Sequence, residues 1–175
     1  MSPRNLILPV ETLNREFDAR VLQSLIAVNR GWTVVMGSKA LINRNIWRFP
    51  PSVYLCQTLT SNRITMLKYL RDLGSSSVGW CEEGFVYPGK DLYLKRRIDT
   101  SSLQLLTALV AWGENNNADL QIKTKETDLQ PLPLGNPRID LLRPEFRKLY
   151  VTEVNKLKDR FGDYLLFNSN FANVN

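Results

Sequence analysis

The sequence NLILPV, residues 5–10, is a short and continuous apolar run, and it sets the fold class of the chain. A strand that is buried on both faces of a parallel sheet has this pattern, because neither of its faces meets water. An amphipathic helix is predicted directly after it, since Phe17, Val21, Leu25 and Val28 recur every three or four residues. A strand followed by a helix is the beginning of a βαβ unit.

The same alternation continues to about residue 113. Further strands are predicted at residues 32–38, 52–57, 76–81 and 108–113, and further helices at residues 60–73, 90–98 and 100–107. Alternating strands and helices are typical of parallel sheets, in which each crossover is a helix. The sequence therefore predicts an α/β, Rossmann-like fold: a mostly parallel sheet with helices on both faces.

The domain organisation follows from where this alternation ends. Residues 1–135 are predicted to form one Rossmann-like domain, whose last part, polar and proline-rich from residue 121, contains an edge strand. Residues 136–162 are predicted to be a connection that includes an amphipathic helix at 144–161. Residues 163–175 read as a single strand, which cannot form a sheet alone. We therefore expect it to be the first strand of a truncated second domain.

The composition of the chain excludes several catalytic mechanisms and favours certain partners. The 175 residues contain no histidine, which excludes histidine-based acid–base catalysis, serine–histidine triads and histidine zinc sites. Cys56 and Cys81 lie inside apolar runs, a usage typical of a reducing, cytoplasmic compartment. The 23 Lys and Arg exceed the 17 Asp and Glu, for a net charge of +6, which favours anionic partners such as nucleotides, acidic sugars or lipid headgroups.

The basic residues are concentrated at one place, Lys95-Arg96-Arg97. A solvated helix face explains this cluster more simply than a nucleic-acid interface, so no nucleic-acid partner is expected. The alternative is a peripheral contact with the anionic inner membrane, where lipid-linked saccharides are made.

Polar residues gather where the predicted strands end. In open parallel sheets, ligands bind at the carboxyl ends of the strands, so these residues are expected to line one edge and to form a substrate site. The candidates are Glu11, Asn14 and Arg15 after the first strand, Ser38, Lys39, Asn43 and Arg44 after the second, Glu82 and Glu83 after the strand at 76–81, and Glu114 after the last.

Simpler explanations exist for several of these candidates. Glu11 and Arg15 have the spacing of an exposed ion pair on a helix, and Asn14 has the chemistry of a helix cap. Ser38 and Lys39 belong to the tripeptide GSK, which lacks the remaining spacing of a nucleotide-binding phosphate loop.

Two adjacent acids, Glu82 and Glu83, stand in the stretch GWCEEGFVYP, residues 79–88. Unpaired charges inside a buried strand are costly, so the two acids are expected in the loop that Gly84 opens. Neighbouring side chains at a strand end point in different directions, so one acid can face a ligand while the other holds the loop. A carboxylate partly desolvated beside Trp80 is suited to act as a general base, whereas an anchor paired with a lysine or arginine is the alternative.

Six blocks of the chain together resemble a bacterial family. They are LILPVETLNREFDAR, GSKALINRN, WCEEGFVY, AWGE, GNPRIDLLRPEFR and YLLFNSNFANVN, and they cover the chain from residue 5 to residue 175. The family is that of the surface carbohydrate biosynthesis proteins of capsule and lipopolysaccharide loci, which are GT-B-like glycosyltransferases. Its members often carry DEEG where this chain has Cys81-Glu82-Glu83-Gly84.

The resemblance implies a two-domain transferase whose acceptor site lies mainly on the amino-terminal half. The nucleotide-sugar donor, the only co-substrate, would lie mainly on a second domain, and neither a cofactor nor a metal is implied. By looser analogy with capsule-building transferases, Glu82 or Glu83 is the catalytic base for a saccharide or lipid-linked saccharide acceptor. The resemblance also places Asn136, Arg138 and Asp140 at the interdomain crossing, and Asn168 and Asn170 on the donor side.

Two other functions remain open at this point. The first is a glycerophosphate transferase or sugar-nucleotide epimerase built on the same two-domain scaffold. The second is a chain without catalysis, either a truncated piece that keeps only the fold or a module that binds a partner. As an isolated half of a transferase, the chain is expected to be inactive.

Overall fold

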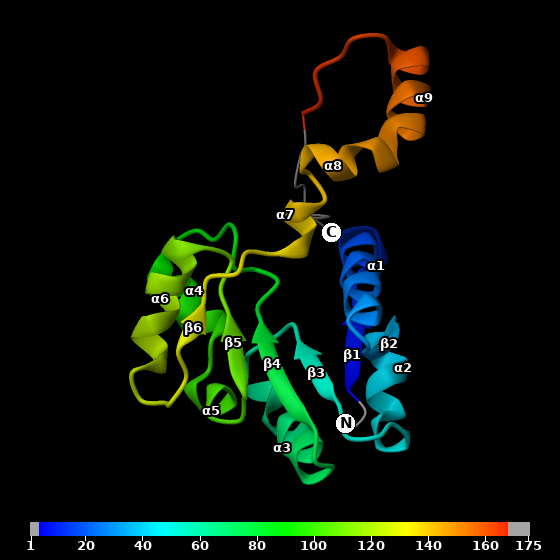
Figure 1. Ribbon diagram of the computed structural model, residues 1–175. Helices are drawn as coiled ribbons and strands as arrows, with labels where there is room; N and C mark the ends of the chain where they lie inside the picture. The colour runs from blue at the N-terminus through cyan, green and yellow to red at the C-terminus, as the bar shows by residue number, and fades with distance from the viewer. Residues whose placement is uncertain (1–3, 168–175) are drawn as a thin grey trace, which may run out of the picture. The chain divides into compact units, whose positions relative to one another are not determined.

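Six parallel strands form the sheet within the described residues, which are 4–167 of this computed structural model. The chain divides into two units, Met1–Ile139 and Asp140–Asn175, and the sheet belongs to the first. The strands lie in the order β2-β1-β3-β4-β5-β6, from right to left in Figure 1. The α/β, Rossmann-like fold predicted from the alternation is confirmed. The strands are β1 (Asn5–Val10), β2 (Thr33–Ser38), β3 (Val53–Cys56), β4 (Ser76–Trp80), β5 (Ala108–Val110) and β6 (Pro131–Leu132).

Helices connect these strands. They are α1 (Leu13–Asn29), α2 (Lys39–Arg44), α3 (Ile64–Asp72), α4 (Lys90–Arg97), α5 (Thr100–Leu103) and α6 (Glu114–Thr124), with short 3₁₀ turns η1 (Ile46–Arg48) and η2 (Ser61–Arg63). The strand order reverses between β1 and β3, because the chain first moves outward to β2 and then returns. Crossovers between parallel strands are right-handed, so α1 covers one face and α3, α5 and α6 cover the other. In agreement, α5 packs against both α3 and α6.

Burial on both faces explains why β1 is a continuous apolar run. Ile7 and Leu8 point to opposite faces of the sheet, and each is 1% exposed. In β4, a Cβ on Gly79 would lie 2.5 Å from Cδ1 of Leu106 and 2.9 Å from Cδ2 of Leu59. Glycine at this position therefore lets Leu59 and Leu106, which lie outside the helices, pack closely against the sheet.

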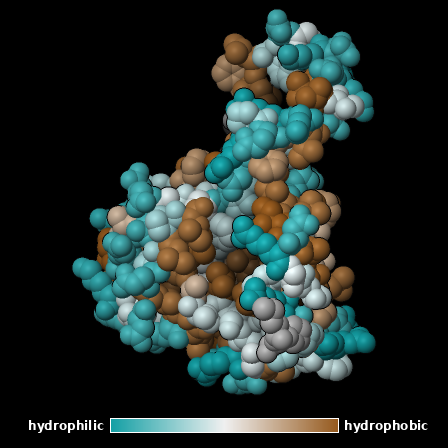
Figure 2. All heavy atoms as spheres, viewed as in Figure 1, coloured by the Kyte–Doolittle hydropathy of each residue, from teal (hydrophilic) through white to brown (hydrophobic). Residues whose placement is uncertain are grey.

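Helix α6 is an element that the sequence pattern did not predict. An edge strand was expected from residue 121, but residues up to Thr124 are helical and the edge strand is the two-residue β6. Three asparagines, Asn115, Asn116 and Asn117, give this segment a weak helix propensity. Burial of Leu120, which is 1% exposed, stabilises the helix through packing instead. The surface over α6 is hydrophilic, which is why its polar sequence resembled a loop (Figure 2).

Helix α1 also turns a different face to the sheet than its apolar spacing suggests. The residues buried along it are Glu16, Ala19 and Arg20. Phe17 and Leu25 belong to the predicted apolar face, yet they are 40% and 58% exposed. The side of the helix that packs inward is therefore the side whose charged residues find partners at the sheet edge.

The second unit is helical in its described part. It contains α8 (Pro144–Arg147), η3 (Lys148–Tyr150) and α9 (Val151–Phe161), so the single helix predicted at 144–161 is divided by a 3₁₀ turn. Residues 163–167, where a strand was expected to begin, are not in a strand. The remainder of that predicted strand lies outside the described residues and stays a prediction. The short helix α7 (Pro137–Asp140) spans the boundary between the units.

Candidate functional site

A pocket of about 310 Å³ lies at the carboxyl edge of the sheet, where β1, β3 and β4 end. The strand order reverses between β1 and β3, and such a switch point is where open α/β sheets bind their ligands. Of the predicted site residues, the structure brings four together in this pocket. The residues that line it are Glu11, Thr12, Arg15, Gln57, Thr58, Arg63, Cys81, Glu82, Glu83 and Arg97.

The loop after β1 and the first turns of α1 build one wall. Thr12 occupies the N-cap position, and its carbonyl accepts the backbone N–H groups of Arg15 and Glu16. Asn14, for which a capping role was considered, is exposed and does not cap the helix. A carboxylate in the first turn suits the positive end of the helix dipole, so Glu16 is stabilised where the helix begins.

Glu16 is fully covered and connects three elements. Its Oε2 accepts hydrogen bonds from the backbone N–H of Glu11 at 2.9 Å and from Nε2 of Gln57 at 2.6 Å. Its Oε1 accepts from Nη2 of Arg15 at 2.7 Å. Burial acts to raise the pKa of Glu16, but these hydrogen bonds and the charge of Arg15 outweigh burial and lower the pKa. Glu16 is therefore held as a carboxylate that ties β1, α1 and β3 together.

The lowered pKa of Glu16 predicts a stability loss in acid. The unfolded chain takes up this proton at a higher pH than the folded chain, so the contribution of Glu16 is complete above its ordinary pKa of 4.5 and is lost as the pH falls through the lowered value. We expect Glu16→Gln to lose less stability than the wild type between about pH 6 and about pH 3. Urea unfolding at the two pH values measures this. The exposed Glu126→Gln serves as control, and equal losses in Glu16→Gln and the wild type would contradict the assignment.

Glu82 is buried between two arginines. Its Oε1 accepts a hydrogen bond from Nη2 of Arg20 at 2.6 Å, and its Oε2 lies 3.2 Å from Nε of Arg138. Arg138 also donates from Nη2 to the backbone carbonyl of Glu82 at 2.9 Å, and its guanidinium stacks 4.8 Å from the ring centre of Trp112. Burial raises the pKa of Glu82, although the positive charges of Arg20 and Arg138 act to lower it. Burial also lowers the pKa of Arg20. Both oxygens of Glu82 face arginine, so this acid holds the loop.

Glu83 has a different environment, although it is the next residue. Its side chain is 41% exposed, and its carboxylate meets one cation, Nη1 of Arg15 at 3.4 Å. It borders the 310 Å³ pocket and a second, smaller pocket of about 130 Å³ that Arg96 and Arg97 also line. Of the two acids, Glu83 is therefore the one that a ligand in these pockets can reach.

Aromatic side chains support the loop that carries the two acids. Nε1 of Trp112 donates to the carbonyl of Cys81 at 2.6 Å, and Phe85 stacks on Trp112 with ring centres 5.4 Å apart. A Cβ on Gly84 would lie 2.9 Å from Nε1 of Trp112, so glycine is required for this contact. Burial raises the pKa of the Cys81 thiol, which makes it a poor nucleophile.

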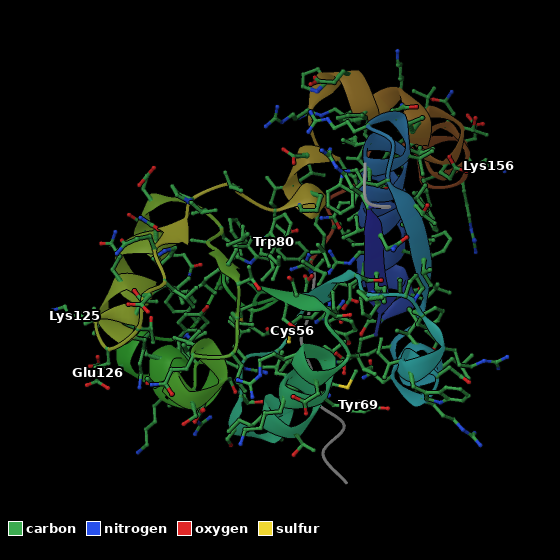
Figure 3. The ribbon with its side chains drawn as sticks, turned by 60° about the horizontal axis from the view of Figure 1, so that its bottom comes forward. Cys56, Tyr69, Trp80, Lys125, Glu126 and Lys156 are labelled. Carbon is green, nitrogen blue, oxygen red and sulfur yellow. The ribbon has the colours of Figure 1, made fainter. Side chains whose placement is uncertain are left out.

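Trp80 closes the same region from β4. Its Nε1 donates to the carbonyl of Gly135 at 3.1 Å. Figure 3 shows Trp80 near the middle of the first unit, whereas Lys125 and Glu126 lie at its margin. Trp80 therefore fixes the segment that leads to Arg138.

The other predicted substrate-binding residues divide into two groups. Lys39 lies beside the site, because its Nζ donates to Oε2 of Glu11 at 2.6 Å. Glu114 is the first residue of α6 and lines a neighbouring pocket of about 300 Å³ with Gly84 and Trp112.

The remaining four predicted residues do not line these pockets. Asn43 accepts a hydrogen bond from the Tyr54 hydroxyl at 2.8 Å and thereby joins α2 to β3. Ser38 is the N-cap of α2, although its side chain makes no capping bond. The side chains of Asn14 and Arg44 make no hydrogen bond or ion pair with another residue of the described part of the chain.

The residues predicted at an interdomain crossing have local partners. Oδ1 of Asn136 accepts the backbone N–H of Arg138 at 3.0 Å, and Arg138 itself contacts Glu82 within the first unit. Asp140 pairs with Arg143 at 2.8 Å in the second unit. The predicted donor-side residues Asn168 and Asn170 lie outside the described residues.

Sequence reasoning missed five residues of the site: Glu16, Arg20, Gln57, Arg63 and Arg97. A signal for the first two was present, since charged residues crowd the segment directly after the first strand. Arg97 belongs to the basic cluster that was interpreted as a solvated helix face. Gln57 and Arg63 carry no recognisable spacing.

No three acidic or cysteine side chains within residues 4–167 lie close enough to form a metal site, and no helix in that range is long and apolar enough to cross a membrane. Comparison of the chain with protein-family models, with curated proteins and with solved structures finds no match.

Proposed function

We propose that this chain is the acceptor-binding half of a glycosyltransferase that acts in bacterial surface polysaccharide biosynthesis. The observation that carries the proposal is the contrast between the two adjacent acids: Glu82 is buried between Arg20 and Arg138, whereas Glu83 is half-exposed at the pocket. A general base must reach the proton that it removes, and of the two acids Glu83 is the one so placed. The resemblance of the sequence blocks to surface carbohydrate biosynthesis proteins supports the same class of reaction.

In the proposed reaction, the carboxylate of Glu83 accepts the proton of an acceptor hydroxyl. The hydroxyl oxygen then attacks the anomeric carbon of the nucleotide sugar, and a new glycosidic C–O bond forms. The bond between that carbon and the phosphate oxygen breaks, and the nucleotide leaves with the electron pair. Cations and helix N-termini that face the phosphate would stabilise the leaving group.

The ion-pair network explains how the base is positioned. Glu82 connects the loop to α1 through Arg20 and to residue 138 through its backbone carbonyl. Because the buried Glu82 anchors the loop, the neighbouring Glu83 is held in position while its carboxylate stays accessible to a ligand. Such positioning contributes strongly to catalysis.

The test uses the protein expressed from its complete open reading frame. It is incubated with CMP-, UDP-, GDP- and CDP-activated sugars, with and without a mixture of saccharide acceptors, and nucleotide release is measured. The proposal expects release from one donor class that depends on the acceptor. Release from CDP-glycerol alone would instead identify a glycerophosphate transferase, and no acceptor-dependent release from any donor would contradict the proposal.

A further inference from the structure

The charges around the 310 Å³ pocket are almost entirely paired. Four carboxylates at or beside it meet four cations: Glu11 meets Lys39, Glu16 and Glu83 both meet Arg15, and Glu82 meets Arg20 and Arg138. Two further guanidinium groups line the pocket, those of Arg63 and Arg97. Neither forms an ion pair with a carboxylate in the part of the chain that the structure describes. The six cations at or beside the pocket therefore exceed the four carboxylates there by two.

Three buried polar atoms of the lining residues also lack hydrogen-bond partners. One of them, Oε2 of Glu82, faces Nε of Arg138 in an ion pair, and the other two have no charged partner in the described part of the chain. These two are Nε of Arg63, which is a donor, and Oε1 of Gln57, which is an acceptor. Gln57 is 4% exposed, and its Nε2 is already used by the carbonyl of Pro9 and by Glu16. Buried polar atoms are normally paired, so an unpaired donor and an unpaired acceptor at one pocket indicate a ligand that offers both.

We propose that the acceptor bound in this pocket is an acidic sugar, whose carboxylate or phosphate is held by Arg63 and Arg97 and whose hydroxyl donates to Gln57. A planar guanidinium binds carboxylate and phosphate oxygens with paired, charge-assisted hydrogen bonds. The pocket lies at the lower end of the range of about 300–1,000 Å³ that holds small molecules, so it suits one or two sugar rings.

The role of the bound sugar as acceptor rests on the proposed function, whereas the binding of an acidic sugar in this pocket does not. Glu83 lines the same pocket as Arg63 and Arg97. A sugar that places its anionic group on the arginines therefore lies within the pocket that the proposed base borders. A negatively charged ligand would also pair with the two cations that remain once the four carboxylates at or beside the pocket are neutralised.

The experiment titrates the 175-residue chain with four probes and observes the side-chain Nε–Hε resonance of Arg63 by NMR. The probes are glucuronic acid, glucose 6-phosphate, glucose and inorganic phosphate. The first two separate a carboxylate from a phosphate as the anionic group. We expect at least one of them to bind about tenfold or more tightly than glucose and than phosphate, since one charge-assisted hydrogen bond accounts for a factor of this size.

Two variants and one matched control locate the binding. Arg63→Gln and Arg97→Gln are each expected to lower affinity for the acidic sugar about tenfold while leaving affinity for glucose unchanged. The control is Arg71→Gln, because Arg71 is an exposed arginine in α3 that lines none of the pockets described above. Thermal unfolding of each variant verifies that the fold is kept.

Three outcomes would overturn the inference. They are affinities of both acidic sugars that equal the affinity of glucose, affinities of both acidic sugars that do not exceed the affinity of inorganic phosphate, and variants of Arg63 and Arg97 that bind as the wild type does. Binding is measured without any donor, so its result is independent of the transfer assay. If an acidic sugar binds while no donor gives acceptor-dependent nucleotide release, the proposed function is contradicted and the binding site is still supported.

Discussion

Glu83→Gln is expected to slow sugar transfer by about 10²–10⁴-fold in the protein expressed from its complete open reading frame, with donor binding unchanged. Glutamine has nearly the same shape as glutamate but cannot take up the proton of the acceptor hydroxyl. Among residues 4–167, the half-exposed carboxylate forms an ion pair only with Arg15, at 3.4 Å, so little else in the described fold depends on it. Single-turnover rates with saturating donor measure the effect on the chemical step.

The control for this experiment is Glu126→Gln, an exposed acid at the margin of the first unit, which should leave the rate unchanged (Figure 3). A wild-type rate in Glu83→Gln would show that this carboxylate is not the base. The pair of acids would then serve only to hold the loop.

Whereas Glu83→Gln is expected to lower the rate of transfer, Glu82→Gln is expected to lower the stability of the fold. We expect it to reduce the free energy of unfolding by about 3 kcal/mol, because removing one member of a buried ion pair leaves an uncompensated charge. The amide would also direct N–H groups toward Arg20 or Arg138, which are donors themselves. Urea unfolding followed by circular dichroism measures the change.

Glu83→Gln is the matched control for stability, since it is the same substitution one residue further along the chain. A partly exposed pair at 3.4 Å contributes little, so a change of at most about 0.5 kcal/mol is expected. Similar losses for the two variants would contradict the different roles that burial assigns to these neighbours.

The fold was predictable because a strand that is buried on both faces of the sheet has a continuous apolar sequence. NLILPV is apolar at every position except its first, and β1 occupies the predicted residues, Asn5–Val10. Helix α6 has no comparably clear sequence pattern. Its three asparagines favour other conformations, and the burial of Leu120 that stabilises it is a property of the assembled layers.

The site was predictable to the extent that position along a strand decides position in space. Glu11, Arg15, Glu82 and Glu83 follow strand ends, and the structure places all four at one pocket. Arg63 and Arg97 reach the same pocket from η2 and from the end of α4, and nothing in their spacing indicates a shared destination. The partners of Glu82 were also hidden, since Arg138 lies 56 residues further along the chain.

Dissolved salt weakens the electrostatic interactions of this site to different extents. Glu82 and Arg20 are buried, so dissolved ions screen their attraction only weakly, and the loop stays anchored at high ionic strength. Arg97 is exposed, and its attraction for an approaching anion falls as the screening length shortens. The architecture thus separates a framework that is insensitive to ionic strength from a capture surface that is sensitive to it.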